Sequence, residues 1–183
     1  VEFTPEALAW STRPRVASKA VADGANTRPM PTPARMKVDA GSLHLDDALV
    51  VVSPSPTDQT LFSAQQLLCV LRKQVGGAVK LVAGDAVKTG GTPIRLGIDA
   101  SAAPSQGYQL HIRHDGIVVI GGDEAGLFYA VQTLIQILRQ KHNRLPLVHI
   151  EDAPEFPARG VMLDIRPDSL QSGKYSSWIF AGL

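Results

Sequence analysis

Three pairs of adjacent acidic residues are the first places in this sequence where catalysis could reside. They are Asp46-Asp47, Asp123-Glu124 and Glu151-Asp152. Carboxylates can act as general acid and general base when they are positioned against a reacting group. These pairs fall at a turn, at the start of a helix and at the end of a strand, where turn formation, capping and solvation account for them. We therefore predict no catalytic residue among them.

The histidines raise the question of a metal site. His111 and His114 are three residues apart, a spacing that brings two ligands together on a helix. Their segment has the alternation of a strand, in which an odd spacing sends two side chains to opposite faces. We expect His111 on the outer face of a sheet and His114 in a turn, both solvated. His44, His142 and His149 are isolated in the sequence, so we predict no metal site.

A glycine-rich stretch, Gly121–Gly126, follows a strand and opens a helix, as a dinucleotide-binding loop would. Its Gly-Gly-x-x-x-Gly spacing differs from the Gly-x-Gly-x-x-Gly fingerprint. Asp123 and Glu124 also occupy the helix N-terminus, where they would repel a pyrophosphate. We favour the interpretation that both carboxylates cap the helix and complement its dipole, each by about 0.3–1 kcal/mol. Nucleotide binding is the weakest of the functional alternatives.

Periodicity shows which elements would position these residues. Tyr108–Ile112 and Ile117–Ile120 flank an Asp-Gly turn, which predicts a β-hairpin with Tyr108, Leu110 and Ile112 buried. The period then changes to 3.6, which predicts a long helix after Asp123. Its apolar stripe is Leu127, Val131, Leu134 and Leu138, widened by Phe128 and Ile135.

A second helix is predicted earlier in the chain, capped by Thr57 or Asp58 and ended by Gly76-Gly77. Its apolar stripe is Leu61, Ala64, Leu68, Leu71 and Val75. Further strands are expected at 43–45, 49–52, 79–82, 94–98 and 147–150. Each helix has one apolar stripe to cover, so we predict an α+β fold with both helices side by side on one face of a mixed or mostly antiparallel sheet.

Taken together, the same segments carry a resemblance. The run from Gly122 to Gln136 is Gly-x-x-x-Gly-Leu-Phe-Tyr-Ala-x-Gln-Thr-Leu-x-Gln, and a Tyr-x-Leu-x-Ile strand precedes it. Ile-x-Asp-x-Pro-x-Phe-Pro-x-Arg-Gly follows at 150–160. In this order the segments resemble the family 20 β-N-acetylhexosaminidases, specifically their non-catalytic N-terminal domain and the first strand of the catalytic barrel. Gly107 departs from the family, which often has an acidic residue at that position.

The resemblance implies a parent enzyme that removes terminal N-acetylhexosamine from glycans by substrate-assisted, retaining hydrolysis without a cofactor. In the family a Glu is the general acid/base and a neighbouring Asp orients the acetamido group, and this pair lies on a later barrel strand. We therefore expect this chain alone to be inactive, with the catalytic barrel as its partner. The family's N-terminal domain is described as zincin-like, which is an architectural label here because no His-Glu-x-x-His occurs. A secreted, periplasmic or lysosomal location is suggested by the resemblance only.

Arg166 is the one candidate substrate-binding residue. The family continues its first barrel strand as Leu-Asp-x-Ser/Ala-Arg, and that Arg binds sugar hydroxyls. This chain has Asp164-Ile165-Arg166-Pro167, with the Arg one position early. A shift of one residue turns a strand side chain to the opposite face, and Pro167 restricts the residue before it. We therefore expect Arg166 to bind no sugar.

Composition excludes several classes of function. The 183 residues carry a net charge of +1 with no basic stripe, which argues against nucleic-acid binding, and membrane association has no support. Cys69 is the single cysteine, so no intramolecular disulfide can form, and we expect it to be a small buried residue. A free-standing carbohydrate-recognition or interaction module is the alternative function. The aromatic content of 5% counts against it.

Four segments are expected along the chain. Residues 1–33 have the composition of a linker or extension, and residues 34–152 form the α+β domain. Residues 153–165 form a connection and the first barrel strand, the truncated start of a TIM barrel. Residues 166–183 match nothing in the family.

Overall fold

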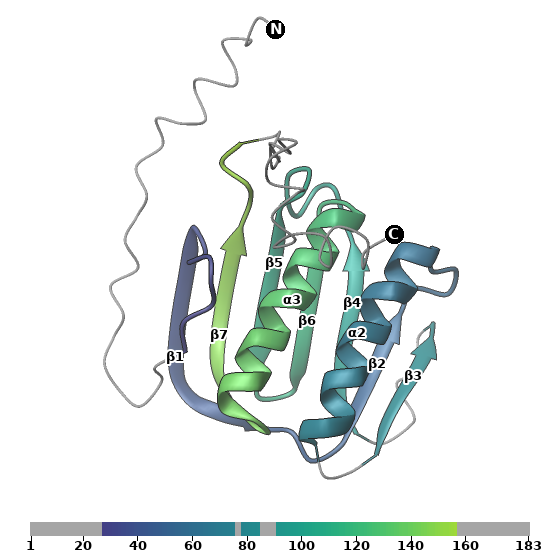
Figure 1. The fold of residues 1–183 in the computed structure, drawn as a ribbon, viewed down its shortest axis with the longest axis vertical. Coiled ribbons are helices and arrows are strands. Elements are labelled where there is room, and N and C mark those ends of the chain that lie inside the picture. The colour runs from purple at the N-terminus through teal and green to yellow at the C-terminus, as the bar shows by residue number, and fades with distance from the viewer. Residues whose placement is uncertain (1–26, 76–77, 85–90, 157–183) are drawn as a thin grey trace, which may run out of the picture. The chain divides into compact units, whose positions relative to one another are not determined.

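Two helices cover one face of a mixed sheet (Figure 1). The structure is a computed structural model and describes residues 27–75, 78–84 and 91–156. Within them, the sheet has seven strands in the order β1-β7-β5-β6-β4-β2-β3. All of these elements belong to one compact unit, Thr12–Glu155. The predicted arrangement of both helices on the same face is confirmed.

The elements follow one another along the chain as the hydrophobic periodicity predicts, with longer strands at both ends. Their bounds are β1 Arg35–His44, β2 Ala48–Val52, α2 Asp58–Gln74, β3 Val79–Ala83, β4 Thr92–Ile98, β5 Tyr108–Arg113, β6 Gly116–Gly121, α3 Glu124–Lys141 and β7 Arg144–Asp152. Strands β1 and β7 pair with each other in antiparallel fashion over most of their lengths. This long-range pairing extends both strands beyond the short apolar runs that the sequence revealed.

The sheet is half parallel and half antiparallel. Strand β2 pairs in parallel with β3 and with β4, and β4 pairs in parallel with β6. Strands β1, β7, β5 and β6 are antiparallel neighbours, and β5 and β6 form the predicted hairpin. Helix α2 is the crossover between β2 and β3, as a parallel pair requires. The sheet is therefore mixed rather than mostly antiparallel.

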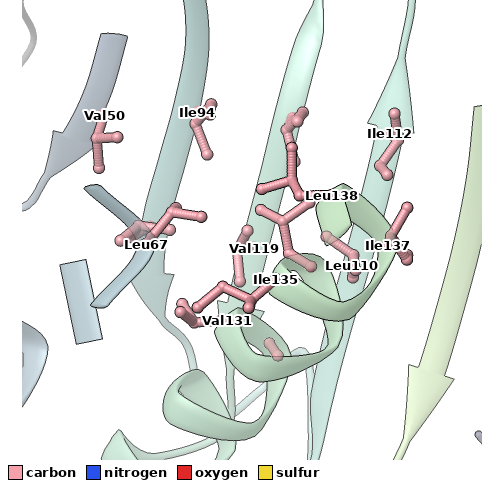
Figure 2. Close-up of a cluster of buried hydrophobic side chains, with 14 of the residues drawn as sticks. Val50, Leu67, Ile94, Leu110, Ile112, Val119, Val131, Ile135, Ile137 and Leu138 are labelled. Atoms are coloured by element: carbon pink, nitrogen blue, oxygen red, sulfur yellow. The ribbon is translucent and has the colours of Figure 1, made fainter. Parts of the chain in front are cut away.

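The core is a single apolar layer between the helices and the sheet. Figure 2 shows side chains of α3, among them Val131, Ile135 and Leu138, gathered against those of the strands. Burying each such side chain contributes about 1.5–3 kcal/mol, so this layer is the main stabilising element of the fold. The four leucines and valines of the predicted α3 stripe are all fully buried: Leu127, Val131, Leu134 and Leu138.

Helix α2 begins after Thr57, one of the two predicted capping residues, and its predicted stripe is buried except at Leu61. The Thr57 hydroxyl accepts a hydrogen bond from the Thr60 backbone N–H at 3.2 Å. Leu67 is fully buried, whereas Leu61 is only half-buried. The prediction that Cys69 is buried is wrong, because its thiol is exposed. Two residues advance about 200° around a helix, which carries Cys69 from the buried side of Leu67 to the opposite side.

An extended segment before β1 is bound along α3 by two glutamines. The Gln140 side chain accepts a hydrogen bond from the Arg28 N–H at 3.0 Å and donates one to the Arg28 carbonyl at 3.2 Å. The Gln136 side chain makes the same two bonds with Met30, at 2.7 and 2.9 Å. Four residues of a helix rise about 6 Å, and two residues of extended chain span about 6.6 Å, so the two spacings match. The glutamine amides thus pair with the segment much as a neighbouring strand would.

We expect replacement of both glutamines, Gln136→Ala with Gln140→Ala, to release this segment while the core stays folded. Each exposed hydrogen bond contributes about 0.5–1.5 kcal/mol, and each kcal/mol lost speeds local amide exchange about fivefold. Hydrogen exchange at the Arg28 and Met30 amides measures the effect. Gln66→Ala, at an exposed glutamine of α2, is the matched control and should leave both amides protected. Unchanged protection in the double variant would contradict the role of the two glutamines.

Candidate functional site

The N-terminus of α3 is closed by its own capping residue. Asp123 Oδ1 accepts from the Gly126 N–H at 2.8 Å. Its Oδ2 accepts from the Ser105 hydroxyl and from the Gln106 N–H, both at 2.8 Å. Partial burial raises the pKa of Asp123, but these hydrogen bonds outweigh it and hold the pKa below its usual value. The carboxylate occupies the place where a dinucleotide phosphate would have to bind.

Two glycines of the same stretch allow a backbone loop to approach the helix. A Cβ on Gly122 would collide with the carbonyl oxygens of Ala103 and Pro104, and a Cβ on Gly126 would collide with that of Gly107. The Gly122 N–H donates to the Gly107 carbonyl at 2.9 Å, which holds the loop in place. The Gly-x-x-x-Gly spacing in this chain is therefore explained by close backbone packing rather than by phosphate binding.

Three other members of the acidic pairs also have structural partners. Asp47 accepts from the Ala78 N–H at 2.6 Å, and Asp46 lies 3.1 Å from the His44 ring. Asp152 accepts from the Ala34 N–H at 2.9 Å. Glu124 is exposed in the first turn of α3. The three acidic pairs thus lie at a turn, at a helix start and at a strand end. The structure does not bring them together into one site.

A buried hydroxyl pair joins β5 to α3. Tyr108 Oη and Thr133 Oγ1 lie 2.8 Å apart, and the Thr133 hydroxyl donates to the Tyr129 carbonyl at 3.1 Å. The Tyr108 hydroxyl also lies 3.5 Å from Asp152 Oδ2. Burial raises the pKa of Tyr108. The phenol therefore stays neutral, and its contacts are structural.

Two histidines meet on the outer face of the sheet, the face opposite the helices. His111 of β5 and His149 of β7 are register partners, and their Nδ1 atoms lie 2.8 Å apart. His149 Nε2 lies 3.0 Å from Glu151 Oε1, and His111 Nε2 lies 3.3 Å from Gln109 Oε1. The outward position of His111 is confirmed. Its expected solvation and the expected isolation of His149 are wrong, because cross-strand pairing brings together residues 38 positions apart.

An aromatic cluster lies over the side-by-side helices. Phe62 of α2 is 46% exposed, and its ring stacks on Phe128 of α3 with 6.1 Å between centroids. Phe128 in turn contacts the Tyr129 ring edge to face, also at 6.1 Å. The Phe62 ring is thus partly exposed where α2 and α3 meet. We name Phe62, Phe128 and Tyr129 the aromatic cluster.

Two sequence predictions are not tested by these observations. Arg166 and the proposed barrel strand at 159–165 lie outside the described residues. Among the residues that are described, no three His, Cys, Asp or Glu side chains are grouped so that they could hold a metal ion. In the same part of the chain, no helix combines the length and hydropathy needed to cross a membrane.

Comparison with known proteins identifies the family. Residues 26–153 match the model of glycosyl hydrolase family 20, domain 2. The chain is 37% identical over 142 residues to N,N'-diacetylchitobiase of Vibrio harveyi, and 30% identical over 147 residues to a β-hexosaminidase of Vibrio vulnificus. These alignments cover 76% and 79% of this chain but only 15% and 16% of the two relatives.

A solved structure agrees with this assignment. The crystal structure of a glycoside hydrolase family 20 β-N-acetylglucosaminidase superposes with a TM-score of 0.55 at 31% identity. The match covers 75% of this chain and 24% of that one. This chain therefore belongs to glycosyl hydrolase family 20, and the fold described above is domain 2 of that family.

We expect Gly126→Ala to destabilise the domain by about 1–3 kcal/mol, because the new methyl group would have to displace the Gly107 backbone. A helix would ordinarily gain from this change, since Ala is favoured over Gly by about 1 kcal/mol. Urea unfolding of the variant measures the difference. Gly97→Ala is the matched control, because a Cβ there meets nothing within 4 Å, and it should be neutral or slightly stabilising. A stabilised Gly126→Ala variant would contradict the close packing.

Proposed function

We propose that this chain is the accessory N-terminal domain of a β-N-acetylhexosaminidase-like glycoside hydrolase. The match of residues 26–153 to domain 2 of family 20 carries the proposal. The relatives that share this domain are several times longer, which supports a role beside a separate catalytic domain. The parent enzyme would remove terminal N-acetylhexosamine from glycans by substrate-assisted hydrolysis. Reading the genomic DNA downstream of the Leu183 codon tests whether a barrel-coding sequence follows.

The helix layer is the surface that we propose docks on the catalytic domain. Its aromatic cluster presents apolar area to solvent, with Phe62 as the most exposed member. The outer face of the sheet, which carries the two histidines, is by contrast polar along β1, where Arg35 and Lys37 are exposed. Aromatic residues are enriched at protein interfaces and charged residues are depleted there. This difference favours the helix side for the contact.

The boundaries of the domain follow from contacts at its ends. Arg28 and Met30 bind α3, so we place the start of the domain near residue 27, before the start at 34 that composition suggested. Strand β7 ends at Asp152, whose carboxylate receives the Ala34 N–H. We propose that residues 153–165 lead into the first strand of a TIM barrel. The zincin-like description of the fold is part of the same proposal.

The purified chain should not hydrolyse an aryl N-acetylglucosaminide, because we assign the catalytic Asp-Glu pair to a barrel strand beyond this sequence. N-acetylglucosamine should likewise produce no saturable NMR shifts, including at Arg166. A chromogenic assay and an NMR titration measure the two outcomes. Turnover that is lost on mutating a residue of this chain would overturn the accessory role. Saturable shifts abolished by Arg166→Ala would instead favour the alternative, a free-standing carbohydrate-recognition module.

Replacing Phe62 by Ser should reduce the apolar surface of the chain without unfolding it, since nearly half of the ring is already exposed. We expect weaker binding of a hydrophobic dye to the chain, with a change in unfolding free energy below about 1 kcal/mol. In the longer gene product, the same change should speed proteolysis between the two domains. Leu81→Ser, at an exposed leucine of the edge strand β3, is the control. Equal effects of both substitutions would argue against a docking role for the aromatic cluster.

A further inference from the structure

The contact between His111 and His149 restricts how many protons the two rings can carry. Gln109 supplies the starting point, because its Nε2 donates to the Ala102 carbonyl at 2.8 Å and a carbonyl can only accept. This fixes the orientation of the amide, so Gln109 Oε1 faces His111 Nε2. An amide oxygen also only accepts, and His111 Nε2 must therefore carry a hydrogen. With its Nε2 protonated, a neutral His111 presents a bare Nδ1 to His149.

The contact with Glu151 determines which nitrogens of His149 carry hydrogen. Glu151 Oε1 faces His149 Nε2, and Glu151 Oε2 lies 3.1 Å from an Arg35 guanidinium nitrogen. A hydrogen bond from His149, followed by one from Arg35, lowers the pKa of Glu151, which is therefore an ionised acceptor. His149 must donate to Glu151 through Nε2 and to His111 through Nδ1. Only an imidazolium does both.

Counting hydrogens excludes the other states. The contacts Gln109–His111, His111–His149 and His149–Glu151 need three N–H groups from the two rings. Two neutral rings supply two, which leaves one contact without a hydrogen. Two imidazolium rings supply four, which places two N–H groups and two positive charges against each other at 2.8 Å.

We propose that His111 and His149 share one excess proton, held on His149, and that a second proton breaks the contact between the rings. The pair is thus an acid-sensitive contact between β5 and β7 on the outer face of the sheet. Entry of the second proton, on His111 Nδ1, turns the acceptor of the Nδ1–Nδ1 bond into a donor. The rings then separate, and Glu151 keeps its bond to His149 while His111 turns away.

The surroundings of the pair favour the single-proton state. The charged groups that face it are Lys37 and Arg35 from β1, Glu151 from β7 and Arg113 from β5. On the neighbouring strand β6, the register partner of His111 is the uncharged Val118. Lys37 lies 3.0 Å from Asp39, which partly offsets its charge. Burial first, and then the positive charges of His149 and Arg113, lower the pKa of His111 below 6.5, whereas Glu151 acts in the opposite direction.

The sign of the pH dependence follows from these shifts. A histidine whose pKa is lowered by folding binds fewer protons in the folded state than in the unfolded state. The stability associated with a neutral His111 is therefore fully present above pH 6.5 and is lost as the pH falls through the lowered pKa of the folded protein. The ionised Glu151 carboxylate contributes to the stability of the fold above pH 4.5, and this contribution is lost as the pH falls through its lowered pKa. On acidification, the loss of the His111 contribution therefore begins at a higher pH than the loss of the Glu151 contribution.

NMR of the chain labelled with ¹⁵N-histidine tests the proposal directly. While the ring contact is intact, we expect the two rings to carry three N–H groups, with His111 as the Nε2–H tautomer. His111 should titrate below 6.5. Two neutral rings with the contact intact, or a His111 midpoint that is not lowered, would overturn the shared proton.

A variant separates the shared proton from burial alone. His149→Phe keeps an aromatic ring and removes the charge, so the titration midpoint of His111 should rise toward 6.5. Glu151 loses the His149 hydrogen bond and keeps that of Arg35. His114→Phe, a matched change outside the pair, should leave the His111 midpoint unchanged. An unchanged His111 midpoint in His149→Phe would show that burial alone sets its protonation. The wild-type spectrum decides the question even if this variant unfolds.

Discussion

The seating of α3 on the sheet depends on one contact, the close approach of its first turn to the backbone of the loop at 103–107. Gly122 and Gly126 bring helix and loop nearer than any side chain would allow. Asp123 then joins the two with hydrogen bonds to Gly126, Ser105 and Gln106. Because a helix is rigid, an anchor at its first turn sets the position of the apolar residues further along it. The packing of α3 on β5 and β6 thus depends on a contact that contains no apolar side chain.

The sheet has two faces with different surroundings, and this difference organises the rest of the molecule. On the helix side, the alternating residues of β5 and β6 are buried in the apolar layer. On the outer face, the intervening positions of β5 and β7 carry Gln109, His111, His149 and Glu151. Because neither α2 nor α3 covers this face, its polar side chains are half-exposed and can pair with one another across strands. The chain of hydrogen bonds through the two histidines is a consequence of this one-sided cover.

The helix layer likewise has two different surroundings along its length. Gln136 and Gln140 hold the extended segment before β1, while Phe62 of the aromatic cluster is exposed and Phe128 and Tyr129 are half-buried. One part of the helix surface is therefore covered by the chain itself, and we propose the other part as the docking surface. This division agrees with membership of a family whose relatives are several times longer than the present chain.

Local periodicity was sufficient to predict the type and order of the elements. Hydrophobic spacing, turn residues and capping residue types identified the helices α2 and α3, the hairpin β5–β6 and the cap Asp123, because each of these depends on neighbours within a few residues. For α2 they left Thr57 and Asp58 as alternatives, and the structure has Thr57 as the cap. Several segments taken in order indicated the family, among them the motif around Gly122 and Gly126. The physical reason for these two glycines, a collision avoided with distant backbone carbonyls, was not visible in the sequence.

Pairing over long distances was decided only by the tertiary structure. The length of β1 and β7, the half-parallel sheet and the meeting of His111 with His149 all follow from strand register. Register joins residues far apart in the sequence, and no local pattern specifies it. The exposed Cys69 and the buried Leu67 show the same limit on a smaller scale, because the edges of the buried face of α2 depend on the sheet against which the helix packs. The sequence by itself therefore determined the elements and the family, and the tertiary structure decided which side chains meet.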